Sequence, residues 1–272
     1  MTELLHFLQT MPDWQKAAWF AGCIALCVLL ETLIPLARFS YNKLRHDAFN
    51  LGLFLFNGII AAPVVLLTSV VMVWADNQQV GLLYHVDLPV WLELLLAILV
   101  LDLVAQYTVH YMLHHVKWMW RLHMVHHADT HVDTTTATRH HPGDLVARLV
   151  FAMVTIVAMG IPAVYYLVYR AITPFFGYLT HANIKLPGQL DRLLSFVVVT
   201  PDMHKFHHHY QAPWTDSNFG NVFSIWDRVF GTLVYADTAD IRYGLDVMDG
   251  DRELDFRYQM LSPVDKSIPR RR

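Results

Sequence analysis

Long apolar runs fill most of the first 180 residues of the chain. Three of them reach the roughly 20 residues that a helix needs to cross a hydrocarbon core of about 30 Å. They cover residues 14–36, 48–74 and 88 to about 111, and each predicts a membrane-spanning helix. The first follows acidic residues and has no small-residue cleavage site, so we expect it to remain as an anchor.

A fourth apolar region, residues 145–179, is long enough for two short helices, because Gly160, Ile161 and Pro162 interrupt it near its middle. We expect a hairpin that enters and leaves the same membrane face. The remainder, residues 181–272, holds most of the charges and is expected to form a cap. The fold class predicted is all-α, with N-terminal spans over 1–109 and a histidine-rich region over 110–272.

The basic residues of the loops predict the orientation, because Lys and Arg concentrate on the cytoplasmic side of membrane proteins. The loop after the first span contains Arg38, Lys43 and Arg45, whereas residues 75–87 contain no Lys or Arg. We therefore expect the N-terminus outside and the chain from about His110 onward to begin on the cytoplasmic side.

Composition supports a membrane protein and excludes an ordinary soluble domain. Hydrophobic residues make up 55% of the chain and charged residues 16%, against about 45–50% and about 25% in soluble domains. A net charge of −3 disfavours a nucleic-acid partner, which would require clustered basic residues. The only two cysteines, Cys23 and Cys27, lie one helical turn apart in an apolar run and are interpreted as packing residues.

The 17 histidines include three clusters at helical spacing. Residues three or four apart share a face of a helix, so the imidazoles within a cluster converge. Eight converging rings exceed what one ion binds and suit two metals. The clusters are His110/His114, His123/His126/His127 and His204/His207/His208.

Imidazole alone does not choose among zinc, copper, iron and nickel. The H-E-x-x-H string of zinc proteases is absent, and a haem would use only two of the histidines. An all-histidine dinuclear site with open positions favours O2 activation at iron over hydrolysis. The other histidines are interpreted as packing residues (His6, His46, His85) or as neighbours of the ligands (His115, His131, His140, His209).

Asp102, Gln106, His110 and His114 recur every four residues and would form a polar stripe on the third span. A carboxylate in lipid is costly and usually faces the interior of a helix bundle. Either Asp102 or Gln106 is therefore a candidate to orient a ligating imidazole through its second nitrogen, with a structural hydrogen bond between helices as an equal alternative.

The three histidine clusters, in this order, resemble the boxes of the membrane-bound fatty acid hydroxylase and sterol desaturase superfamily over about residues 102–235. Further matches are Arg139-His-His141-Pro142, His181-Ala-Asn183 and Thr200-Pro201. Asp216-Ser-Asn218-Phe-Gly220 and Trp226-Asp227-Arg-Val-Phe-Gly231-Thr232 resemble the alkylglycerol monooxygenase and sterol C5-desaturase branches in particular.

By this resemblance His141 and His181 join the ligands, giving ten, and Asn183, Asp216, Asn218 and Asp227 join the candidates that support them. The sequence departs from the family's pattern at Gly177, where some fatty acid 2-hydroxylases have a further histidine. The ten ligands could therefore be a different set in this protein.

The resemblance implies two iron ions, O2 as co-substrate and a lipid taken from the bilayer, with oxidation of an unactivated C–H bond on the cytoplasmic side. Hydroxylation is favoured over desaturation, and ether cleavage is a third outcome. No dinucleotide, Fe–S or haem-attachment motif occurs, so a separate electron donor of reductase, ferredoxin or cytochrome type is expected. Lys117, Arg121 and Arg139 are candidates to dock it, or to contact lipid head groups. The rival hypothesis is a metal-binding or transport protein of the membrane without redox turnover.

Overall fold

The computed structural model describes residues 2–38, 40–236, 238 and 241–269. These residues form helices joined by loops and contain no strand, only two isolated β-bridges, which confirms the all-α prediction. The helices in chain order are α1 (Thr2–Thr10), α2 (Asp13–Leu33), α3 (Lys43–Asn77), α4 (Val90–Asp102), α5 (Val109–His115), α6 (Lys117–His127), α7 (Pro142–Met159), α8 (Ala163–His181), α9 (Gly188–Leu194), α10 (Pro201–His207), α11 (Ile225–Val229) and α12 (Phe256–Leu261).

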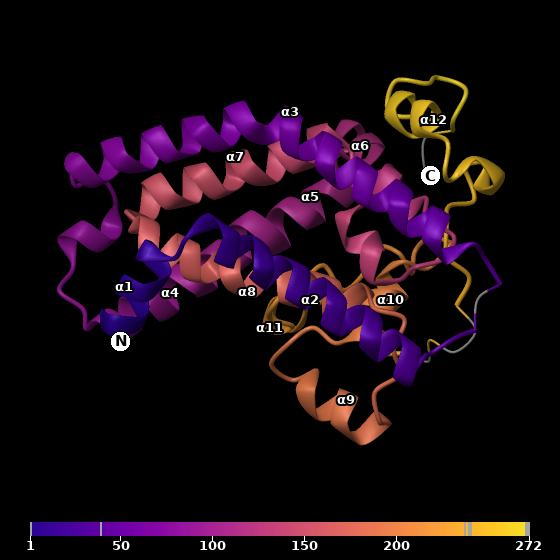
Figure 1. Ribbon diagram of the computed structural model, residues 1–272, viewed down its shortest axis with the longest axis horizontal. Helices are drawn as coiled ribbons and strands as arrows, with labels where there is room; N and C mark the ends of the chain where they lie inside the picture. Colours follow the sequence, from indigo (N-terminus) through magenta and orange to yellow (C-terminus); the bar gives the residue numbers. More distant parts are fainter. Residues whose placement is uncertain (1, 39, 237, 239–240, 270–272) are drawn as a thin grey trace.

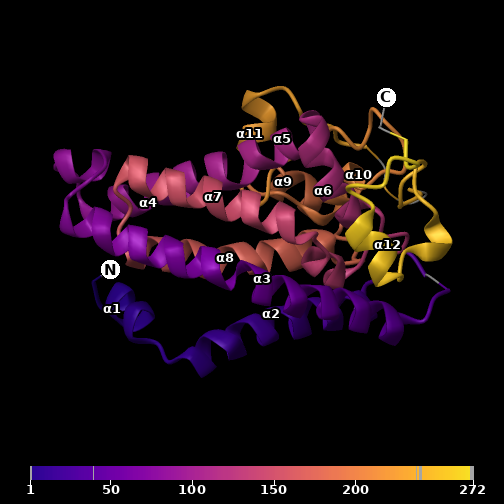
Figure 2. The same ribbon diagram turned by 90° about the horizontal axis from the view of Figure 1, so that it is seen from above.

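The long helices run along the long axis of the molecule, with α1 at one end and the C-terminal segment at the other (Figures 1 and 2). In the described part of the chain, four helical segments are long and apolar enough to cross a membrane: Asp13–Leu33, Lys43–His85, Val90–His115 and Pro142–Met159. The three spans expected from the sequence are among them. The chain is thus a multi-pass membrane protein.

The third span contains a feature that the sequence did not reveal. A π-helical turn, Leu103–Thr108, joins α4 to α5, so the run from Val90 to His115 is continuous but not uniformly α-helical. The division predicted between residues 109 and 110 falls inside this run. The wider turn changes which residues share a face on either side of it.

The fourth apolar region forms two helices, α7 and α8, that turn at Gly160, which has a left-handed backbone with φ of 67°. Pro162 precedes α8 and starts it. The two helices contact different neighbours: α7 packs against α3, and α8 packs against α2 and α10. Both return to one end of the molecule, since His141 caps the start of α7 and His181 ends α8.

Helix α8 carries Arg170 near its middle. Trp19 of α2 donates a hydrogen bond from Nε1 to the carbonyl of Ala171, over 2.9 Å. This bond holds the part of α8 that contains Arg170 against helix α2.

The segment after α8 contains short helices joined by loops. Helix α10 begins at Pro201, and the Thr200 hydroxyl accepts a hydrogen bond from the backbone N–H of Met203. The loop that follows α10 is fixed by Asn218, which has a left-handed φ of 53°. Its side-chain amide donates to the carbonyls of Met203 and Val234, and its side-chain oxygen accepts from the backbone N–H of Val234. The predicted cap therefore consists largely of loops held by polar contacts.

Candidate metal centre

The structure brings nine of the ten predicted ligand histidines into two adjoining groups. Within each group, one ring nitrogen from every histidine lies within 4.8 Å of those of the others. All nine residues are buried, with 8% exposure or less. The first group is His110, His114, His123, His127 and His207, and the second is His126, His181, His204 and His208.

Each group is assembled from distant parts of the chain. His110 and His114 come from α5, His123 to His127 from α6, and His204 to His208 from α10 and its end. The α6 and α10 clusters contribute to both groups, because adjacent residues such as His126 and His127 point about 100° apart around the helix. The two groups therefore share supporting backbone, as a dinuclear site requires.

Hydrogen bonds at the second ring nitrogen fix the orientation of most of these imidazoles. His114 and His123 contact Asp216 and Asp144 through Nδ1, at 3.1 and 2.6 Å. Four more rings contact backbone carbonyls through Nδ1: His110 with Phe219, His126 with Arg139, His181 with Gly177 and His207 with Ser217. Protonation at Nδ1 leaves the Nε2 lone pair available for a metal.

The spacing of the ring nitrogens fits metal ligation. Nε2 of His110 lies 3.1 Å from that of His123, and Nε2 of His181 lies 3.1 and 3.0 Å from those of His126 and His204. Ligands at about 2.1 Å from one ion are about 3.0 Å apart at right angles and about 3.4 Å apart in a tetrahedron. The observed distances match the first arrangement.

Buried nitrogens without partners also fit a metal. In the described residues, both ring nitrogens of His127 and His208, and Nε2 of His207, are buried and accept or donate no hydrogen bond. An unsatisfied buried polar atom costs about 1–3 kcal/mol, which a bound cation would remove. Burial, followed by neighbouring histidines, lowers the pKa of these three residues well below the ordinary 6.5, so the rings are neutral at pH 7.

His141, the tenth predicted ligand, lies in neither group. Its Nδ1 accepts a hydrogen bond from the backbone N–H of Gly143 and so caps the N-terminus of α7, over 3.0 Å. Its neighbour His140, which the sequence analysis placed among the outer histidines, stacks on His126 with ring centroids 4.5 Å apart. The cap geometry explains the difference, because Pro142 at the first helical position turns His141 away from the centre.

Asp144 contacts the histidine groups but was not among the residues predicted from the sequence. This buried carboxylate in the first turn of α7 contacts Nδ1 of His123 at 2.6 Å and Nδ1 of His140 at 3.2 Å, and pairs with Arg148 at 2.8 Å. The sequence did offer a signal for Asp144, because an acidic residue at the start of an apolar helix is costly unless it has a partner.

Two supporting candidates from the third span do not contact an imidazole. Asp102 accepts hydrogen bonds from the backbone of Val222 and Phe223 and from Trp226 Nε1, and Gln106 accepts one from Arg148. Neither residue therefore orients a ligating ring in this structure. The alternative, a structural hydrogen bond between segments, describes Asp102, which joins the third span to residues 222–226. Asp102 directly precedes the π-helical turn and Gln106 lies within it, so neither shares the regular α-helical spacing of His110 and His114.

The other residues predicted to support the ligands lie at different distances from the histidine groups. Asp216 contacts His114 directly. Asp227 accepts from the backbone N–H groups of Phe219 and Gly220, at 2.7 and 2.9 Å, and so fixes the carbonyl that His110 contacts. Asn183 pairs with Ala37 through its side-chain amide and ties the first loop to the end of α8.

Of the three residues predicted to dock an electron donor or to contact lipid head groups, only Lys117 is exposed, whereas Arg121 is partly buried and Arg139 is buried. Arg139 is completely buried, donates to the carbonyls of Val125 and Glu253, and lies over the Phe49 ring. Arg121 donates to carbonyls of the C-terminal segment, including that of Ser262. Both guanidinium groups stabilise the protein's own fold.

A cavity of about 200 Å3 opens onto the histidines. His110, His126, His181 and His204 line one part of it, and Gly177 leaves open space beside them because nothing lies within 4 Å of where its Cβ would be. Polar residues and residues of α2, α3 and α8 line the rest, among them Gln106, Arg148, Asn221, Phe20, Phe54 and Arg170. A substrate in this cavity would reach the centre from the membrane side.

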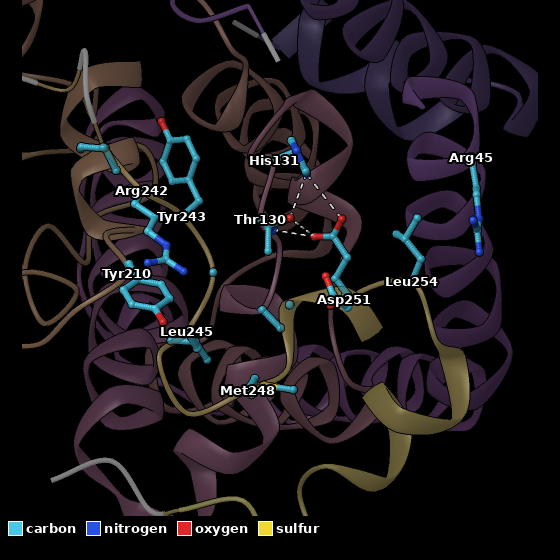
Figure 3. Close-up of a pocket in the computed structure, with 15 residues that line it drawn as sticks. Arg45, Thr130, His131, Tyr210, Arg242, Tyr243, Leu245, Met248, Asp251 and Leu254 are labelled. Carbon is cyan, nitrogen blue, oxygen red and sulfur yellow. Dashed lines mark hydrogen bonds and ion pairs between the residues drawn. The ribbon is translucent and has the colours of Figure 1, made fainter. Parts of the chain in front are cut away.

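A larger cavity, about 600 Å3, is lined by residues of the C-terminal segment, Arg45 and the loop after α6, and none of the ten predicted ligands lines it (Figure 3). Tyr210 and Arg242 stack on one side of it, with the guanidinium carbon 3.9 Å from the ring centre. Thr130 and His131 contact Glu253 on the other. The cavity volume therefore does not identify the site of the chemistry.

Membrane spans that end in two adjoining groups of buried histidines are typical of a narrow class of membrane metalloproteins. The sequence profile of the fatty acid hydroxylase family matches residues 94–232, which is half of the chain and contains every histidine of both groups. The chain belongs to the fatty acid hydroxylase family.

Individual relatives are enzymes that oxidise lipids. An ornithine lipid hydroxylase of Rhizobium tropici is 26% identical over 79% of this chain and 65% of its own length. The alkylglycerol monooxygenase of Homo sapiens is 29% identical over 66% of this chain and 38% of its own, and methylsterol monooxygenase 1-3 of Arabidopsis thaliana is 26% identical over 61% and 57%. The matches thus span less than two thirds of each of these relatives. No solved structure matches the chain significantly.

Proposed function

We propose that this protein is a di-iron, O2-dependent oxygenase that hydroxylates a C–H bond of a membrane lipid. The observation that carries the proposal is the double cluster of nine buried imidazoles, six of them fixed through Nδ1, at the end of the membrane spans. Imidazole ligands are compatible with iron as one of several metals, and the relatives are named as hydroxylases and monooxygenases of lipids, which favours iron.

The chain's own residues would hold and enclose the reactants. His110, His114, His123, His127 and His207 would hold one ion and His126, His181, His204 and His208 the other, with His140 beside the second. Iron would supply O2 activation there. The cavity between α2, α3 and α8 would position one C–H bond of the lipid and exclude competing groups, which is the protein's contribution to such chemistry.

Hydroxylation requires an electron source outside this chain. One oxygen atom enters the C–H bond and the other leaves as water, so each turnover consumes two electrons and two protons in addition to O2. A separate donor of reductase, ferredoxin or cytochrome type would supply the electrons.

We place the centre on the cytoplasmic side. The basic loop between α2 and α3 lies at the same end as the histidines, because Lys43 Nζ pairs with Asp133 at 2.8 Å and Asn183 bonds Ala37. The concentration of basic residues in this loop supports a cytoplasmic position for both.

The test is lipid mass spectrometry of cells that express the protein under isotopically labelled O2. We expect a lipid that gains one labelled oxygen atom and is absent from cells without the protein. A lipid that instead loses two hydrogens without gaining label would indicate desaturation. No change in any lipid, from protein that contains iron, would contradict an oxygenase and favour metal binding or transport.

A further inference from the structure

Arg170 lies at the junction of three cavities. It lines the histidine-lined cavity of about 200 Å3 and two apolar ones of about 450 and 430 Å3. Phe20 is the one other residue that lines all three. The apolar cavities lie between α1, α2 and α8 and between α3, α7 and α8, so they face the membrane interior.

The guanidinium of Arg170 has no ion pair or hydrogen bond with any residue that the structure describes. Arg148, the other arginine of the histidine-lined cavity, is by contrast paired with Asp144 and bonded to Gln106. A charged side chain beside membrane spans is costly, and such residues usually pair with one another or mark the path of a polar ligand. Arg170 is therefore a cation whose partner is not part of the fold.

Arg170 is exposed at the surface of the protein, but its position along α8 is far from both ends of the helix. It lies seven residues after the start of α8 and eleven before His181, about 10 and 16 Å along the helix axis. The bond from Trp19 to Ala171 keeps this part of α8 against α2. The side chain thus lies between the two ends of the helix, beside the route from the membrane to the histidines.

We propose that Arg170 binds an anionic group, a carboxylate or a phosphate, of the lipid substrate. The planar guanidinium matches either anion with two parallel hydrogen bonds. The histidine-lined cavity holds about seven water volumes at roughly 30 Å3 each, the size of a polar head rather than of a whole lipid. The head then lies in that cavity, the acyl part lies in the apolar cavities, and Arg170 binds where they meet.

The test is equilibrium binding to the purified, iron-loaded protein in neutral maltoside detergent, with dodecanoate, dodecyl phosphate and dodecanol as probes. We expect the wild type to bind at least one of the two anions ten times or more tighter than the alcohol. Arg170→Gln should raise the Kd of the anions tenfold or more and change that of dodecanol less than twofold. The anion that binds tighter identifies the carboxylate or the phosphate as the group recognised.

The matched control is Lys117→Gln. Lys117 is an exposed cation like Arg170 but lines none of the three cavities, so its removal should leave all three Kd values within twofold. Arg170→Lys, which keeps the charge, should retain a preference for the anions and serves if the glutamine variant does not fold. An equal Kd for anions and alcohol in the wild type, or anion binding unchanged in Arg170→Gln, would overturn the proposal and assign Arg170 to contacts with lipid head groups.

The inference rests on the proposed function in one respect only, namely that the bound lipid is called the substrate. The binding experiment involves no turnover, so its outcome is independent of product formation. Anion binding through Arg170 in a protein that oxidises no lipid would contradict the proposed function alone.

Discussion

Replacing His207 with alanine is expected to reduce the oxidised lipid below about one hundredth of the wild-type amount. His207 is completely buried, contacts the carbonyl of Ser217 through Nδ1 at 2.6 Å, and presents Nε2 to the five-histidine group. Loss of a partner that merely orients a ligand costs about 10–100-fold in metal affinity or activity, and loss of a ligand should cost more. Comparative lipid mass spectrometry of cells that express either protein measures the effect.

His209→Ala is the matched control, since it removes an imidazole two residues away that faces outward. The Nδ1 of His209 accepts from the backbone N–H of Gln211 and the ring belongs to neither group. This variant should form product at close to the wild-type level. Equal product from the His207 variant, with equal protein in the membrane, would remove His207 from the ligands.

Asp144→Ala is expected to weaken iron binding 10–100-fold and to lower the free energy of unfolding by about 3–5 kcal/mol. The change removes the acceptor that orients His123 and leaves the partly buried cation of Arg148 without its carboxylate partner. Iron retained against a chelator of known affinity measures the first effect, and thermal unfolding in detergent measures the second.

Asp144→Asn separates the two contributions. The amide oxygen can still accept from His123 but carries no charge for Arg148, so iron binding should stay nearer the wild type while stability falls. An alanine variant that retains iron as tightly as the wild type would show that Asp144 does not support the centre.

The membrane spans were predictable because length and apolarity decide them locally. The first three predicted ranges correspond to α2, α3 and the run from α4 to α5, and Gly160 and Pro162 indicated the turn between α7 and α8. Helical spacing also indicated which faces of α6 and α10 carry the histidines. These features depend on neighbours in sequence.

Features that depend on distant contacts were not predictable. Arg139 is a basic residue in a polar stretch, yet the carbonyls of Val125 and Glu253 make its burial possible. The π-helical turn after Asp102 leaves no mark in the four-residue spacing, and the cap that His141 forms with Gly143 leaves His140 as the one of the two that stacks on His126. The burial of Arg139 and the cap at His141 both depend on contacts with backbone that local sequence patterns do not specify.

The iron content of the purified protein tests the account most directly. Protein produced with ample iron and measured by elemental mass spectrometry should contain two iron atoms per chain, one for each histidine group. A chain that contains no iron, or binds a single ion under these conditions, would contradict a dinuclear oxygenase centre.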